Sequence, residues 1–364
     1  MASNAGQRQQ AVAAGMMVLA LSVMGIQAAN AEHSGPIASL QVDERLLAYT
    51  PTQQVSGTLK VQGSDTMASL MHRLSSEFQR RQSKVSATTV GGGSNKAITQ
   101  FLETPLKFTG KINLKEERPA HPAVIASSRP LTEKELKEFV TTHGYEPLAV
   151  PVAMDAVALY VNAENPLQGL TLDQVDAIFS AGQQRGHQAA VTQWGQLGLG
   201  HNWESSPVHM YGRDSRSGTR AFFQEHALAG GAFSSKVVEE PGAASVILDV
   251  MRDPVGIGYS GIGLETANTH IIAIAENANS PFVMPTAATV ADQTYPLRRL
   301  LYLYVDKAPG ASLTPAVQEF LSFVTSRDGQ EAVVKAGFFP VPVDQFKKGM
   351  FALEPIGVVA PVSN

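Results

Sequence analysis

Four short segments rich in glycine, serine and threonine lie where a strand-like apolar run gives way to a helical pattern. They cover residues 63–66, 91–94, 127–130 and 212–219. The first turn of a helix carries backbone N–H groups without intrahelical partners, and neighbouring hydroxyls supply further donors. In the last segment Arg213 adds a planar, permanently charged guanidinium that suits an oxyanion. If the four segments converge, they form a site for a small tetrahedral anion, although any single one of them is more often an ordinary helix cap.

The elements that would position these segments follow from the apolar periodicity. A short apolar run precedes each segment, and apolar side chains with helical spacing follow it. Thr132 and Glu135 have the spacing of a capping box at the third helix start. This alternation predicts an α/β fold with mostly parallel strands. In such sheets ligands bind beyond the carboxyl ends of the strands, where all four segments are expected.

Composition narrows the classes of function. The chain has 364 residues, no cysteine and a formal net charge of −4. The lack of cysteine excludes disulfides, thiolate zinc sites and a lipid-modified cysteine, and no basic excess is present for a nucleic-acid partner. The histidines are scattered without metal-ligand spacing, and the chain has neither a Gly-x-Ser-x-Gly elbow nor a P-loop motif. We therefore expect no catalytic residues, no metal site and no cofactor.

The N-terminus has the pattern of an export signal. An apolar run from Ala11 to about Ile26 follows the lone charge of Arg8 and ends in a small-x-small tripeptide at 29–31. This pattern predicts a cleaved signal peptide over 1–31 and a periplasmic mature protein. The alternative is a membrane anchor, because the run approaches the length of about 20 residues that spans a bilayer.

Several longer stretches carry a resemblance to a known family. They are 63–66 with the sequence Gly-Ser-Asp-Thr, 151–158, 169–180, 213–219 and 256–263. In these stretches the chain resembles the phosphate-binding proteins of phosphate ABC importers, the PstS family, over nearly all of its expected mature length. The resemblance implies a two-lobe periplasmic binding protein fold of the type II solute-binding class, with a hinge of crossing strands that closes on the anion.

The resemblance also implies a domain layout. The chain would leave lobe one near Val150 and return to it near Gly261. The expected parts are a signal peptide at 1–31, an N-terminal arm at 32–57, lobe one at 58–150 and 262–345, lobe two at 151–261, and a C-terminal tail at 346–364.

By position, the resemblance assigns phosphate-binding residues to both lobes. Asp65 and Arg129 are additional candidates, and Arg216 either contacts the anion or points to solvent. Because the ligands come from two lobes, the anion would favour the closed form. The assigned set, with Met67 acting through its backbone N–H, is Thr66, Met67, Ser94, Ser128, Arg213, Ser217, Gly218 and Thr219.

One position departs from the pattern of some members of that family. Those members carry an aspartate in the third turn, which accepts a hydrogen bond from protonated phosphate and repels fully ionised sulfate. Here Ser128 stands at that position, followed by Arg129. Asp155 lies in an apolar stretch, where an unpaired charge would be costly. It is either the replacement acceptor or a hinge carboxylate paired with an arginine.

The implied function is capture of inorganic phosphate and its delivery to an ABC permease in the inner membrane. We expect no chemistry on the ligand, no nucleic-acid partner and a monomeric protein. Two other classes stay open: a receptor for another tetrahedral oxyanion such as sulfate, and a secreted phosphatase or interaction protein on the same fold. A phosphatase needs a metal or an activated nucleophile. An interaction protein would use the arm at 32–57 or the tail at 346–364.

Overall fold

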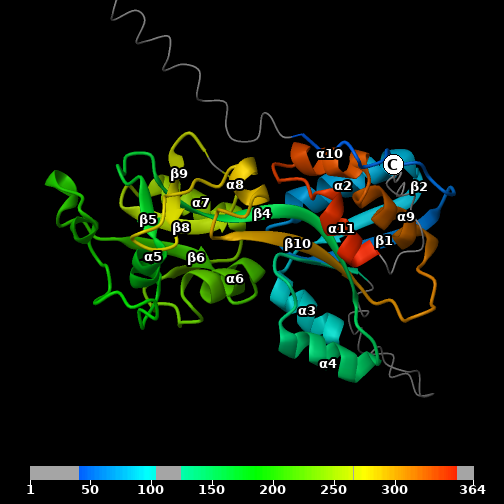
Figure 1. Ribbon diagram of the computed structural model, residues 1–364, viewed down its shortest axis with the longest axis horizontal. Helices are drawn as coiled ribbons and strands as arrows, with labels where there is room; N and C mark the ends of the chain where they lie inside the picture. The colour runs from blue at the N-terminus through cyan, green and yellow to red at the C-terminus, as the bar shows by residue number, and fades with distance from the viewer. Residues whose placement is uncertain (1–40, 104–123, 265, 351–364) are drawn as a thin grey trace, which may run out of the picture. The chain divides into compact units, whose positions relative to one another are not determined.

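Strands and helices alternate along the chain, as the sequence predicts for an α/β fold. The computed structural model describes residues 41–103, 124–264 and 266–350 (Figure 1). The strands are β1 (Ser56–Gly63), β2 (Lys84–Val90), β3 (Val124–Ser127), β4 (Leu148–Asn162), β5 (Gly169–Thr171), β6 (His209–Arg213), β7 (Val238–Glu240), β8 (Gly256–Gly261), β9 (Thr269–Ala275) and β10 (Arg298–Val305). The helices are α2 (Ala68–Arg81), α3 (Ser94–Leu102), α4 (Glu133–His143), α5 (Leu172–Phe179), α6 (Gly218–Ala227), α7 (Ala243–Arg252), α8 (Ala287–Ala291), α9 (Pro315–Val324), α10 (Arg327–Lys335) and α11 (Val343–Met350).

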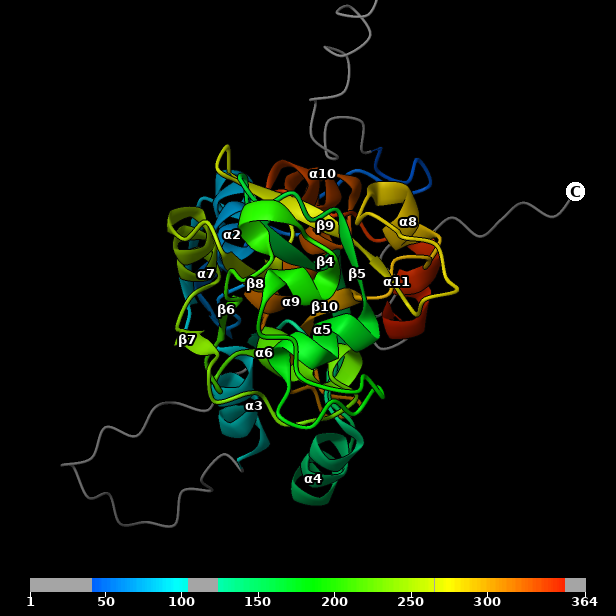
Figure 2. The same cartoon turned by 90° about the vertical axis from the view of Figure 1, so that its left-hand side faces the viewer.

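The strands form a sheet in the order β2-β1-β3-β10-β4-β8-β6-β7, and β9 pairs with β4 and β5. The pairs β1–β2, β1–β3, β6–β7 and β6–β8 are parallel, whereas β10 runs antiparallel to both β3 and β4. Helix α7 packs against β8, and α8 packs against β4 (Figure 2). None of the helices in the described part of the chain is long and apolar enough to cross a membrane.

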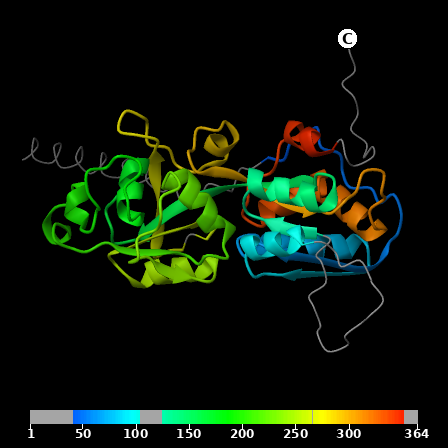
Figure 3. The same cartoon turned by 90° about the horizontal axis from the view of Figure 1, so that it is seen from below.

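Strand β4 connects two halves of the sheet. Its residues 148–156 pair with β10, whereas residues 157–162 pair with β8 and β9. The strand is 15 residues long and almost entirely buried, because its sequence is a nearly continuous apolar run. β4 and β10 run side by side between the two groups of elements (Figures 1 and 3).

Each half of the sheet has its own hydrophobic core. The first core is built by β1, α2, β3, the start of β4, β10, α9 and α10, with a smaller cluster under α3 and α4. The second core is built by the rest of β4 with α5, β6, α6, α7, β8 and β9. We call the elements around the first core lobe one and those around the second core lobe two.

The chain returns to lobe one later than the sequence suggested. The expected boundary put residues 262–345 in lobe one, but Ile272, Val290 and Leu297 belong to the second core. The reason is that β9 pairs with the end of β4 and with β5, a long-range pairing that local sequence patterns do not show. The return to lobe one is made by β10, from residue 298.

The two ends of the described chain pack onto the lobes. In the expected arm, the Tyr49 hydroxyl donates to Glu319 Oε2 at 2.7 Å, and the Tyr49 N–H donates to Asp328 Oδ2 at 2.8 Å. The expected tail begins inside α11, whose Phe346 is fully buried in the second core. The signal peptide at 1–31, the first part of the arm and residues 351–364 of the tail lie outside the described residues.

Candidate functional site

The four hydroxyl-rich segments follow the carboxyl ends of β1, β2, β3 and β6, as the sequence predicts. Parallel pairing of β1 with β2 and β3 brings the first three segments to one edge of the lobe-one sheet. The fourth segment leads from β6 into α6 of lobe two. The predicted capping box at Thr132 and Glu135 is present at the start of α4.

Hydroxyl groups from the two lobes meet in a buried cluster. Thr66 Oγ1 lies 2.8 Å from Thr219 Oγ1, and Ser94 Oγ lies 3.1 Å from Ser128 Oγ. All four side chains are buried. Ser217 is buried as well, and its Oγ accepts the Arg220 N–H as the cap of α6. The turns that the sequence assigned to one anion site therefore come together in space.

Glycines permit this close approach. A β-carbon on Gly218 would lie 2.7 Å from both Ser94 Oγ and Ser128 Oγ. A β-carbon on Gly93 would lie 2.3 Å from the carbonyl oxygen of Arg216, and Gly93 has a φ of +93° that disfavours other residues. Both contacts join lobe one to lobe two, so glycine at these positions lets the lobes close.

Arg213 is buried, and its positive charge is only weakly balanced by neighbouring groups. Its Nη2 donates to the Pro241 carbonyl at 3.0 Å, and the same nitrogen is 3.5 Å from Asp65 Oδ2. Its Nη1 is 3.5 Å from Thr66 Oγ1, and its Nε has no hydrogen-bond partner among the described residues. Burial lowers the pKa of the guanidinium, and nearby Asp65 only partly offsets this effect. A buried guanidinium with an unused N–H is suited to an anion.

Arg299 of β10 is a functional candidate that sequence reasoning did not name. Its Nε and Nη2 donate to Asp155 Oδ2 at 2.9 and 2.7 Å, and Nη2 also donates to Thr219 Oγ1 at 3.0 Å. Its Nη1 has no hydrogen-bond partner within the described ranges. Two adjacent arginines in an otherwise apolar strand pattern, 298–305, were the only local signal.

Asp155 and Arg299 form a fully buried ion pair at the hinge. Burial raises the pKa of the Asp155 carboxyl, while the Arg299 guanidinium acts against that rise. Asp155 Oδ1 accepts one further N–H, from Ile262 at 3.3 Å. This geometry matches the arginine-paired interpretation of Asp155. The acceptor role is compatible with it, because a carboxylate has about four lone-pair sites, and it stays a prediction.

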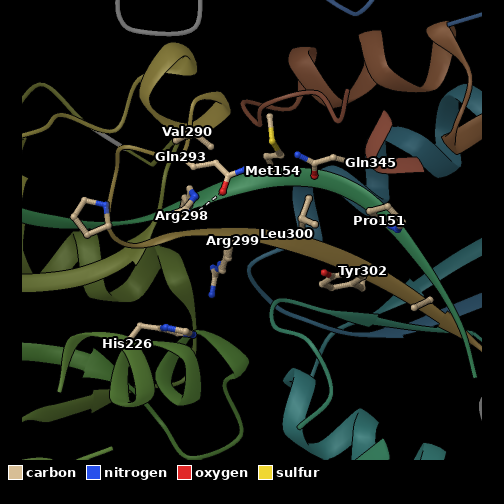
Figure 4. Close-up of a pocket in the computed structure, with 12 residues that line it drawn as sticks. Pro151, Met154, His226, Val290, Gln293, Arg298, Arg299, Leu300, Tyr302 and Gln345 are labelled. Carbon is tan, nitrogen blue, oxygen red and sulfur yellow. Dashed lines mark hydrogen bonds between the residues drawn. The ribbon is translucent and has the colours of Figure 1, made fainter. Parts of the chain in front are cut away.

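A cavity of about 640 Å³ flanks this part of β10 (Figure 4). Arg298 and Arg299 point to opposite sides of the strand in this view, as successive residues of a strand do. Arg299, His226 and Tyr302 are among the residues that line the cavity. Arg299 therefore lies between this cavity and the hydroxyl cluster.

Asp65 holds the glycine-rich turn rather than pointing away from the site. Its Oδ1 accepts the Gly92 N–H at 2.8 Å, and its Oδ2 faces Arg213. Met67, whose side chain is buried in the first core, donates its backbone N–H to Ser64 Oγ at 3.3 Å. Met67 follows Thr66 of the hydroxyl cluster directly in the sequence.

Arg129 and Arg216 are both held by protein groups. Arg129 is buried and donates to Asn95 Oδ1 and to both oxygens of Glu135. Arg216 is half exposed and donates to Asp214 Oδ2. Neither side chain is hydrogen-bonded to the hydroxyl cluster, and Arg216 points toward solvent.

The described part of the chain contains no group of three or more His, Asp or Glu side chains that could hold a metal ion. What the site offers is a set of neutral hydroxyls, helix starts and two buried guanidinium groups. Such a set binds an anion by hydrogen bonds and charge.

Comparison with known proteins agrees with this chemistry. A family model described as the PBP superfamily domain matches residues 48–328. The phosphate-binding protein PstS of Pseudomonas aeruginosa is 40% identical over 309 residues, which cover 85% of this chain and 91% of that protein. The chain belongs to the PstS family of phosphate-binding proteins.

Solved structures related to this PstS-family chain have the same fold. A putative phosphate ABC transporter substrate-binding protein from Clostridium perfringens, solved with bound phosphate, has a TM-score of 0.62 at 22% identity and covers 78% of this chain and 100% of its own. An ABC-type phosphate transport receptor from Vibrio cholerae has a TM-score of 0.58 at 20% identity, with the same coverages. They confirm the predicted two-lobe fold.

Proposed function

We propose that this protein binds inorganic phosphate between its two lobes and delivers it to an ABC importer. The observation that carries the proposal is the pair of buried guanidinium groups, Arg213 and Arg299, beside hydroxyls from both lobes. Each guanidinium retains an N–H without a partner among the described residues. An oxyanion supplies the charge and the acceptors that these groups need. Membership of the PstS family supports phosphate as that anion.

The anion would take the place of the hydrogen bonds that now link the cluster. On the lobe-one side it would accept from Thr66, the Met67 N–H, Ser94 and Ser128. On the lobe-two side it would accept from Arg213, Ser217, the Gly218 N–H and Thr219. Because donors come from both lobes, the closed form binds more tightly than the open form, and the anion drives closure.

Asp155 is the proposed source of discrimination between phosphate and sulfate. Monohydrogen phosphate has a proton to donate, whereas sulfate has none at neutral pH, so a carboxylate acceptor rejects sulfate. Asp155 has lone pairs beyond those used by Arg299 and Ile262. It also lies close to the cluster, since a β-carbon on Gly261 would be 2.9 Å from Thr66 Cγ2 and 3.3 Å from Asp155 Oδ2.

A receptor for sulfate or a related oxyanion is the second candidate, because Ser128 leaves the third turn without a carboxylate. Calorimetric titration of phosphate-stripped protein, with phosphate and then sulfate at two pH values, separates the candidates. Tight phosphate binding with weak sulfate binding supports the proposal. Equal binding indicates a general oxyanion receptor, and binding of neither anion overturns the function.

The protein captures its ligand without changing it, acting as a monomer in the periplasm. The family is one of binding proteins, and the hydroxyl cluster, as far as the described residues go, contains no general base paired with a nucleophile. Turnover of a chromogenic phosphate ester by pure protein would overturn this part of the proposal. Fractionation of expressing cells tests the periplasmic location, and light scattering tests the monomer.

A further inference from the structure

Asn95 joins the two lobes outside the anion site. It lies in the first turn of α3, in lobe one, directly after Ser94. Its side-chain Nδ2 donates to the Ser215 carbonyl at 2.9 Å and approaches the Ser217 carbonyl at 3.4 Å. Its backbone N–H donates to the Arg216 carbonyl at 3.1 Å. All three acceptors belong to the turn between β6 and α6 in lobe two.

The orientation of the Asn95 amide is fixed from its other end. Asn95 Oδ1 accepts Nε and Nη2 of Arg129 at 3.1 and 2.9 Å. A guanidinium only donates and a carbonyl only accepts, so the amide oxygen must face Arg129 and the amide nitrogen must face lobe two. Arg129 therefore sets which group Asn95 offers to the opposite lobe.

Arg129 is itself fixed by the start of α4. Its Nη1 and Nη2 donate to the two oxygens of Glu135 at 2.7 Å each, and Nη1 also donates to the Pro130 carbonyl at 2.9 Å. Glu135 Oε2 in turn accepts the Thr132 N–H in the capping box. The chain of contacts runs from a helix cap through an ion pair to an amide that reaches across to lobe two. All of these groups except the lobe-two carbonyls belong to lobe one.

We propose that Asn95 is a latch that holds the lobes together after closure, and that Arg129 and Glu135 position it. Here the latch means Asn95 with its hydrogen bonds to Ser215, Arg216 and Ser217. These hydrogen bonds use backbone carbonyls that are not proposed to contact the anion, so the latch stabilises the closed form without adding a ligand. The proposal rests on the proposed function, because closure on phosphate is what the latch prolongs.

The latch predicts a kinetic signature. Its hydrogen bonds form only once the lobes meet, so their loss speeds phosphate release and leaves the association rate unchanged. Asn95→Ala removes the side-chain hydrogen bonds and should raise the Kd about ten-fold, almost entirely through the dissociation rate. Asn95→Asp keeps the acceptor for Arg129 but places a carboxylate against carbonyl oxygens, so the phosphate Kd should rise by at least as much as in Asn95→Ala.

The matched control lies one turn further along α3. Thr99 is exposed, and its hydroxyl donates to the Asn95 carbonyl at 3.0 Å without reaching lobe two. Thr99→Ala should keep the phosphate Kd within about two-fold of the wild-type value. That result would show that a change in the hydrogen bonding of α3 alone does not reproduce the effect of Asn95→Ala.

A double-mutant cycle tests the positioning role of Arg129. Arg129→Met alone should weaken phosphate binding about five-fold, because the Asn95 amide is free to turn. In the Asn95→Ala background the same change should add less than about two-fold, since its effect passes through Asn95. Glu135→Gln keeps an oxygen for Thr132 and should show a smaller loss in the same direction. Full additivity of the Arg129 and Asn95 changes would overturn the positioning role.

Stopped-flow binding with a phosphate-sensitive fluorescent label supplies both rates for each variant. A dissociation rate for Asn95→Ala and Asn95→Asp equal to that of the wild type overturns the latch while leaving phosphate binding intact. Failure of the wild type to bind phosphate overturns the proposed function instead. In that case the latch is overturned with it, because the latch acts on the form that closes on phosphate.

Discussion

Gly218 offers a test of the closed geometry, in which one added methyl group should weaken phosphate binding without lowering the stability of the phosphate-free protein. It begins α6 in lobe two and faces two serines of lobe one. A β-carbon there would lie 2.7 Å from Ser128 Oγ, Ser94 Cβ and Ser94 Oγ, against about 3.4 Å for ordinary contact. Gly218→Ala therefore keeps the lobes several tenths of an ångström apart.

The magnitude follows from overpacking. Forcing an extra methyl group into a packed contact costs about 1–3 kcal/mol. The whole cost falls on the closed form, because the serines and Gly218 belong to different lobes, so the phosphate Kd should rise about 5- to 150-fold. In the open form the alanine is unobstructed by lobe one, and alanine favours a helix over glycine by up to about 1 kcal/mol. The Tm without phosphate should therefore stay unchanged or rise.

The assay combines calorimetric titration with thermal unfolding of phosphate-stripped protein. Gly200→Ala is the matched control, since Gly200 has a φ of −96° and a β-carbon added there would meet no atom within 4 Å. That control should leave the Kd and the Tm unchanged. Wild-type affinity in Gly218→Ala would refute the reasoning, because it would mean that phosphate binds without the Ser94–Gly218 contact.

Three further changes probe the charges. Arg213→Gln should raise the phosphate Kd at least about 100-fold in calorimetry, as expected when one partner of a buried charge contact is lost, with little change in Tm. Asp155→Asn leaves Arg299 without its counter-charge and should lower the free energy of unfolding by about 3 kcal/mol in urea; it should also narrow the preference for phosphate over sulfate. For Glu135, burial acts to raise the pKa, but hydrogen bonds from Arg129 and Thr132 outweigh it and lower the pKa below its usual value. Its carboxylate therefore contributes fully to the free energy of unfolding above about pH 4.3, the usual glutamate pKa. That contribution is lost as the pH falls through the lowered pKa. The free energy of unfolding of Glu135→Gln should therefore decrease less than that of the wild type as the pH is lowered.

Each of these has a contrary outcome. Phosphate binding by Arg213→Gln at the wild-type Kd would remove Arg213 from the site. An Asp155→Asn protein as stable as the wild type would mean that Arg299 does not need the Asp155 carboxylate as its counter-charge. Parallel acid limbs for Glu135→Gln and the wild type would show that the Arg129–Glu135 pair contributes nothing to stability.

Local sequence patterns were sufficient to predict the turns that form the site. Hydroxyls and glycines between a strand run and a helix run specify a helix start at the carboxyl end of a strand, and the α/β alternation specifies where such ends gather. The structure accordingly brings Thr66, Ser94, Ser128 and Thr219 together. The sequence analysis did not identify Arg299, because its role depends on the register of β10 against β4. That register aligns Arg299 with Asp155, 144 residues away in the sequence.

The lobe boundary was predicted wrongly, and the sequence left the directions of Arg129 and Arg216 open, for the same kind of reason. Nothing within 262–297 reveals that β9 will pair with β4, so the end of β8 looked like the return crossing. Arg129 follows a site turn in the sequence, but its direction is decided by Glu135 on the next helix and by Asn95 on another. Neighbours distant in sequence, rather than local propensity, fix these features.

The position of β10 in the sheet also shapes how the chain reaches its native state. Val124 to Ser127 of β3 pair with Val305 to Tyr302, so one edge of β3 has no partner until that late strand is available. Most of the chain between them in sequence builds the second core, whereas α4 and the start of β4 belong to lobe one. Such pairing across the sequence is slow, and an unpaired strand edge invites association with other chains. A chain truncated before residue 298 would therefore expose the β3 edge, and we expect it to aggregate rather than accumulate as a folded fragment.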